Sequence, residues 1–189
     1  MAEKLFRDVF PDVKLGRHED LIGQTIVTGV VMVEETAELE VYLKSTNLIS
    51  REDLDWLEDA MALVLFPDSD VKCIVRETFS LSSQYNLESL TDMYKDSLLL
   101  EVKHTSHVDY RILKRGEWII NDDMLTILVE DTAIAREHSR RMSNFLAFLY
   151  ESKFGLKVSV DFEYSDERWD CQLQTAQMDI YVPIKKLEG

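Results

Sequence analysis

The chain has 189 residues, of which 46% are hydrophobic and 30% are charged, and these values are typical of a folded protein with a buried core. Asp and Glu outnumber Lys and Arg by 36 to 21, which gives a formal net charge of −15 at pH 7. Because nucleic-acid phosphates are bound mainly by clustered Lys and Arg, this charge argues against a protein that binds DNA or RNA over its general surface.

Membrane insertion and secretion are also disfavoured by the sequence. The longest apolar runs, residues 26–33 and 98–100, are far shorter than a membrane-spanning helix requires. Residues 1–4 lack the basic start of a secretory signal. There are only two cysteines, and Cys73 lies in a strand-like pattern, where we expect a small buried thiol. A reducing cytoplasm fits this composition best.

The first half of the chain predicts a β-hairpin, a helix and a third strand. Residues 25–33 are rich in β-branched side chains and residues 39–44 alternate, with a turn at 34–37 between them. Ser50, followed by Asp53, approximates a capping box and predicts a helix that starts after Ser50. The apolar residues of this helix recur at helical spacing and are Leu54, Leu57, Met61, Val64 and Leu65. Residues 67–70 form a turn, and Cys73 and Val75 alternate with polar residues in the next strand.

The middle of the chain predicts two helices. One carries an apolar stripe made of Leu87, Leu90, Tyr94 and Leu98. The other is capped at residues 105–106, carries Val108 and Ile112, and ends near Gly116. We expect both helices to pack between the two halves of the molecule, because the stripe must be buried against a neighbour.

The last part repeats the order of the first. Residues 118–120 and 125–129 predict a second hairpin around the turn at 121–123. The helix that follows carries five apolar residues, Ile134, Met142, Phe145, Leu146 and Leu149, and Gly155 is its C-cap. Val158, Val160 and Phe162 alternate in the final strand.

Together these elements predict an α+β protein with two small repeated β-β-α-β modules joined by helices. The predicted divisions are a first module at 1–80, linking helices at 81–116, a second module at 117–164, and a tail at 165–189. The tail either has no counterpart in the two modules or is left over from cloning.

Candidate catalytic and metal-binding residues are few. Asp161 and Glu163 have the spacing of paired carboxylates that hold a divalent ion, but strand alternation places both on the solvent face. Asp68 and Asp70 lie between a predicted helix and a predicted strand, where the chain must turn and Asp is a common turn residue. His104 and His107 can form a helical zinc pair, but no further ligand motif completes it. We therefore assign no catalytic, metal, cofactor or partner-binding residue and expect no cofactor. Trp56 and the tyrosines remain ambiguous between core and interface, namely Tyr85, Tyr94, Tyr110 and Tyr150.

Two β-rich modules with a crossing helix suggest a KH-like shape, which raises the alternative of a module that binds single-stranded nucleic acid. Such a module needs a Gly-x-x-Gly loop at the phosphates, and no two of the glycines fall three residues apart. Two basic clusters, residues 111–115 and 136–141, are expected to be solvated helix faces. Nucleic-acid binding is therefore the second hypothesis, and metal-dependent phosphodiester cleavage the third.

Several stretches resemble the N-terminal region of PolC-type DNA polymerase III alpha subunits of low-GC Gram-positive bacteria. The stretches are LSSQY at 81–85, LESL at 87–90, YKDSLLLEVK at 94–103 and LVEDTAIAR at 128–136. Residues 9–11 and 162–164 also fall where that family has similar residues, so the resemblance covers about residues 5–164. The sequence from residue 169 onward does not match the family.

The resemblance implies a noncatalytic region whose full-length parent would be a DNA-directed DNA polymerase. It implies two small subdomains with a truncated KH-like fold, similar to the polymerase-binding domain of the clamp-loader tau subunit. The implied role is protein–protein contact within the replisome, with tau among the possible partners. The oligomeric state is not implied.

Overall fold

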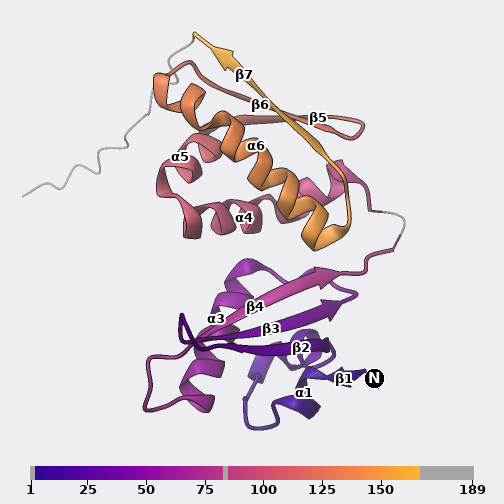
Figure 1. Ribbon diagram of the computed structural model, residues 1–189. Coiled ribbons are helices and arrows are strands. Elements are labelled where there is room, and N and C mark those ends of the chain that lie inside the picture. Colours follow the sequence, from indigo (N-terminus) through magenta and orange to yellow (C-terminus); the bar gives the residue numbers. More distant parts are fainter. Residues whose placement is uncertain (1–2, 83–84, 167–189) are drawn as a thin grey trace, which may run out of the picture.

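The computed structural model describes residues 3–82 and 85–166, and it contains two β-sheets with six α-helices in that part of the chain (Figure 1). The predicted α+β class is confirmed. From residue 167 onward, the predicted tail lies outside the described residues, and so does Cys171. The division into modules at residues 80, 116 and 164 stays a prediction. No helix within the described ranges is long and apolar enough to cross a membrane.

The first unit is built around a four-stranded sheet in the order β1-β2-β3-β4. Its elements are β1 (Lys4–Leu5), α1 (Phe6–Val9), a 3-10 turn (Gly16–His18), α2 (Glu19–Ile22), β2 (Ile26–Val33), β3 (Glu38–Ser45), α3 (Arg51–Leu65) and β4 (Lys72–Phe79). β2 and β3 are antiparallel, and α3 returns the chain so that β4 runs parallel to β3.

The second unit has a three-stranded sheet in the order β5-β6-β7. Its elements are α4 (Leu87–Thr105), α5 (His107–Arg115), β5 (Glu117–Asn121), β6 (Met124–Glu130), α6 (Ala133–Phe154) and β7 (Ser159–Ser165). Again a hairpin is antiparallel, and the strand after the crossing helix is parallel. That the two units are copies of one KH-like module stays a prediction.

Capping residues mark the N-termini of α3 to α6 and the C-terminus of α6. At the N-termini of α3 to α6 the capping side chain accepts a hydrogen bond from the backbone N–H three residues later, and these caps are Ser50, Asn86, Ser106 and Thr132. Gly155 adopts φ of 68° after α6, a left-handed conformation that favours glycine, as predicted for the C-cap. The predicted caps at Ser50 and Ser106 are therefore confirmed.

Two apolar residues at the starts of α5 and α6, which were expected on buried helix stripes, lie on the surface instead. Val108 in α5 is 45% exposed and Ile134 in α6 is 54% exposed. Both lie in the first turn of their helix, where the chain has just left the cap and the neighbouring elements do not yet cover it. By contrast, the predicted stripe of α4 is fully buried.

The two units meet along α4 and α6, which lie between the second sheet and β4 in Figure 1. Three aromatic rings from different elements pack at this boundary: Phe79 of β4, Tyr94 of α4 and Phe154 of α6, with centroids 5.3 to 5.5 Å apart. Such ring pairs contribute beyond the area they bury. The contact between the units is therefore a continuation of the hydrophobic core.

Candidate functional sites

The carboxylate pair Asp161 and Glu163 lies on the last described strand, β7. Both residues are exposed on β7, while Val160 is buried and Phe162 half-buried, so the predicted alternation is confirmed. No group of three or more His, Cys, Asp or Glu suited to a metal ion occurs within residues 3–82 and 85–166. Asp68 and Asp70 are exposed in the turn between α3 and β4.

The two histidines considered for zinc lie on different helices. His104 is in α4 and His107 is in α5, because Ser106 caps a new helix between them. His104 Nε2 lies 3.5 Å from Asp55 Oδ2, and both side chains are partly exposed. The hypothesis of a helical His pair is therefore wrong.

Cys73 and two of the ambiguous tyrosines belong to the core. Cys73 is buried, and burial together with Glu58 raises the pKa of its thiol to about 11. Tyr94 donates to the Ile49 carbonyl over 2.9 Å, and the Tyr150 and Thr91 hydroxyls are 2.7 Å apart. Trp56 is partly exposed and stacks on His18 with centroids 4.3 Å apart.

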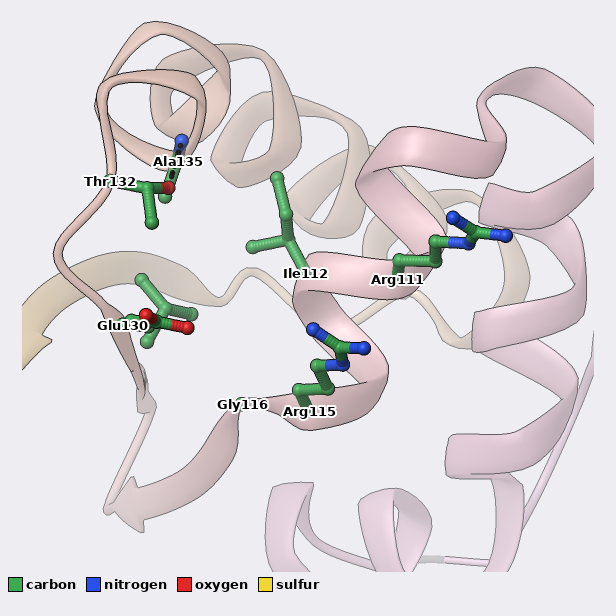
Figure 2. Close-up of a pocket in the computed structure, with 8 residues that line it drawn as sticks. Arg111, Ile112, Arg115, Gly116, Glu130, Thr132 and Ala135 are labelled. Carbon is green, nitrogen blue, oxygen red and sulfur yellow. Dashed lines mark hydrogen bonds between the residues drawn. The ribbon is translucent and has the colours of Figure 1, made fainter. Parts of the chain in front are cut away.

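A small pocket of about 120 Å³ lies between the end of α5, β6 and the start of α6 (Figure 2). Its apolar wall is formed by Ile112, Val129 and Ala135, and Arg111, Arg115 and Glu130 add charges of both signs. The Thr132 side chain already caps α6 by accepting from the Ala135 N–H at 3.1 Å. The pocket therefore presents two guanidinium groups and one carboxylate around a small apolar wall.

Two of the three arginines in the basic cluster at 136–141 are engaged with acids of their own unit. Arg136 makes two hydrogen bonds to Asp131, at 2.6 and 2.7 Å. Arg141 binds Asp109 through Nε and Nη2, and His138 also contacts Asp109. Burial alone would raise the pKa of Asp109, but the hydrogen bonds from Arg141 and His138 hold it below its ordinary value. These pairings leave less positive charge for a nucleic-acid backbone.

A buried ion-pair network joins the two units and was not anticipated from the sequence. It consists of Arg51 and Glu58 of α3, Glu77 of β4, Glu101 of α4 and Lys153 of α6. Arg51 Nη2 lies 2.5 Å from Glu58 Oε1 and its Nη1 lies 3.4 Å from Glu101 Oε1. Lys153 Nζ lies 2.8 Å from the same Glu101 oxygen and also contacts Glu77 Oε1. Glu101 thus bridges the cations of both units.

The two carboxylates on Lys153 have different protonation behaviour. Burial raises the pKa of Glu77 despite the adjacent Lys153 ammonium. Burial would act on Glu101 in the same sense, but Lys153 and Arg51 together lower its pKa. Glu77 Oε2 is the one buried side-chain oxygen or nitrogen without a hydrogen-bond partner within the described part of the chain. The buried carboxylates of this network are therefore stabilised by Arg51 and Lys153.

A groove of about 610 Å³ runs along the network between β4 and α6. Phe145 and Phe148 line one side, and Ile74 and Arg76 line the other. The Val75 N–H donates to Glu58 Oε1 over 2.8 Å. The groove therefore combines an apolar wall with a charged floor whose groups mostly satisfy one another.

The far end of the first unit carries an exposed apolar surface, which we call the apolar end. It consists of Val30, Val31, Met32, Leu63 and Val64, all of them exposed. The Lys72 N–H donates to the Ala37 carbonyl over 3.0 Å, so the α3–β4 connection lies beside the β2–β3 turn. β2 and the end of α3 therefore contribute side chains at the same end of the sheet. Exposed acids surround it, namely Glu34, Glu35, Asp68 and Asp70.

The sequence offered partial signals for this surface. Residues 30–33 are four consecutive apolar residues without the alternation of a half-buried strand, which signals a strand with apolar side chains on both faces. Val64 was expected on the buried stripe of α3, but it is 40% exposed. The stripe prediction is wrong at Val64: Leu65 in the same turn packs against the core, so Val64 lies outside the buried face of α3.

The fold and surfaces define an α+β protein of two small sheet units with an exposed apolar end. Residues 5–75 match the family model described as DNA polymerase III polC-type N-terminus I. The predicted resemblance to the PolC-type N-terminal region is therefore confirmed for this part of the chain, which covers most of the first unit. Neither the comparison with curated proteins nor the comparison with solved structures found a match.

Proposed function

We propose that the chain is a noncatalytic protein-interaction region at the N-terminus of a PolC-type DNA polymerase III alpha subunit. It docks replisome proteins in the cytoplasm, and the clamp-loader tau subunit is the first candidate partner. The match of residues 5–75 supports the polymerase context. The apolar end carries the proposal of docking, because exposed apolar side chains rimmed by polar residues are typical of protein interfaces.

The arrangement of the rest of the molecule supports docking over chemistry. Glu77 and Glu101, whose pKa values are shifted, are buried in ion pairs that hold the two units together. Two arginines of the second unit, Arg136 and Arg141, are engaged by Asp131 and Asp109. A truncated KH-like fold for each unit belongs to this proposal, and the shared strand order of the two sheets supports it.

The test is a binding measurement at physiological salt with purified clamp-loader tau subunit and, separately, a labelled single-stranded oligonucleotide. We expect saturable binding of the tau subunit and no binding of the oligonucleotide. Binding of the oligonucleotide alone, with affinity falling steeply as salt rises, would favour the nucleic-acid alternative instead. Magnesium-dependent cleavage of the oligonucleotide that is lost in Asp161→Ala would show an enzyme.

A further inference from the structure

The two edges of the first sheet differ in how far they are covered by other parts of the chain. At the β4 edge, the Glu58 carboxylate accepts from the Val75 N–H, and α6 packs against the strand. At the opposite edge, β1 pairs only with Ile26 and Val27 of β2. Within the described residues, no strand pairs with positions 28–33 on that side. An unpaired edge presents backbone donors and acceptors to any chain that can adopt an extended conformation.

The side chains at this open edge are apolar on both faces. Val30 and Met32 lie opposite the buried Val41 and Leu39 and so share the face that α3 covers, while Val31 lies opposite Glu40 on the other face. Their exposed fractions are 44%, 45% and 48%. Natural edge strands are normally protected by charges, proline or bulges, and the bulge in β2 falls at Thr28, so it does not interrupt Val30, Val31 and Met32. Three exposed apolar side chains on an open edge are therefore a feature that a partner is expected to cover.

The charges around the edge select the partner. The turn after β2 carries Glu34 and Glu35, and the adjacent α3–β4 turn carries Asp68 and Asp70, all exposed. Lys72 is the exposed cation next to these turns. A second copy of the chain, with its own net charge of −15, would be repelled, whereas a cationic segment would be attracted.

We propose that the open edge of β2 at residues 28–33 binds an extended segment of a partner protein as an additional β-strand. The segment has apolar side chains at alternate positions, which cover Val30, Val31 and Met32, and Lys or Arg at the end beside Glu34 and Glu35. Main-chain hydrogen bonds supply affinity in this mode, and the alternate side chains supply specificity. The inference rests on the proposed docking function and adds the surface and the chemistry of the partner.

The experiment compares Val31→Lys with the matched control Ile134→Lys, which changes an equally exposed β-branched residue in the second unit. We expect Val31→Lys to weaken binding of the tau subunit at least tenfold and Ile134→Lys to change it less than twofold. We also expect amide hydrogen exchange at residues 28–33 to slow in the complex. Circular dichroism and thermal unfolding check that both variants fold.

The outcomes separate this inference from the proposed function. If the tau subunit binds the wild type and Val31→Lys equally well, the docking function stands, but the inference that the β2 edge is the binding surface is wrong. If the tau subunit does not bind at all, a synthetic probe still tests the edge: a peptide of alternating Val and Thr that ends in three Lys. Slowed exchange at residues 28–33 with this peptide, but not with a version that ends in three Glu, supports the inference. Its absence, or dimerisation of the chain through β2 in sedimentation, overturns it.

Discussion

Acidic residues are arranged differently in two regions of the molecule. They are buried in ion pairs at the contact between the two units and exposed to solvent at the apolar end of the first unit. At the contact, Glu77 and Glu101 are withdrawn from water and held by Lys153 and Arg51, so the charges fix how the units pack. At the apolar end, Glu34, Glu35, Asp68 and Asp70 are exposed around Val30, Val31 and Met32. One set of carboxylates therefore specifies the internal architecture, and the other is available to select a partner.

The largest effect that would test this comparison is expected from Lys153→Met. Removing one partner of a buried ion pair leaves an uncompensated charge, and we expect the free energy of unfolding to fall by about 3–5 kcal/mol. Urea denaturation measures the loss. Lys157→Met, at an exposed position four residues along, should change stability by less than about 0.5 kcal/mol. If the two variants were equally stable, the network would not hold the units together.

A smaller loss is expected from Tyr94→Phe. The Tyr94 hydroxyl donates to the Ile49 carbonyl, and its removal leaves that buried acceptor without this donor. The cost should be about 1–3 kcal/mol, measured as a lower midpoint of thermal unfolding. Tyr110→Phe is the control, because its hydroxyl contacts the exposed Lys114. Equal midpoints for Tyr94→Phe and wild type would contradict a role for this bond between α4 and the first unit.

The pH dependence of stability distinguishes the two carboxylates on Lys153. The pKa of Glu101 is lowered from its ordinary 4.5, so its contribution to stability is present above pH 4.5 and is lost as the pH falls below that value. The pKa of Glu77 is raised, so its ionisation costs stability as the pH rises above 4.5. We expect Glu101→Gln and Glu77→Gln to change the slope of unfolding free energy against pH in opposite senses. Slopes that change in the same sense would reject this assignment.

The smallest effect is expected at the apolar end. Val31→Lys replaces a side chain that is 48% exposed, so the free energy of unfolding should change by no more than about 0.5 kcal/mol. Chemical denaturation of the isolated chain measures it. A loss of 2 kcal/mol or more would mean that Val31 belongs to the core and that the proposed distinction between the two regions is wrong.

Much of the fold could be predicted from local sequence patterns, because caps, turns and alternation act over a few residues. The hairpin around residues 34–37, the helix start after Ser50 and the C-cap at Gly155 are examples. Val108 and Ile134 were placed wrongly because helical spacing identifies a face but does not tell where along the helix a neighbour covers it.

The contact between the units could not be predicted in the same way. Lys153 and Glu77 are 76 residues apart, and local periodicity contains no information on such a pair. One signal was present: the alternation through Cys73 and Val75 continues to Glu77, which places this acid on the buried face of β4. An acid at such a position needs a cation from elsewhere in the chain, and α6 supplies it.

The distance in sequence between Glu77 and Lys153 also has a consequence for the order of assembly during translation. Every strand of the first sheet is complete by Phe79, so this sheet can form on the ribosome long before Lys153 is synthesised. In that interval Glu77 has no ammonium beside it, and the site at the end of β4 must remain hydrated or protonated. Docking of α6 then expels solvent from this site, which makes joining the halves a late step in the folding of the nascent chain.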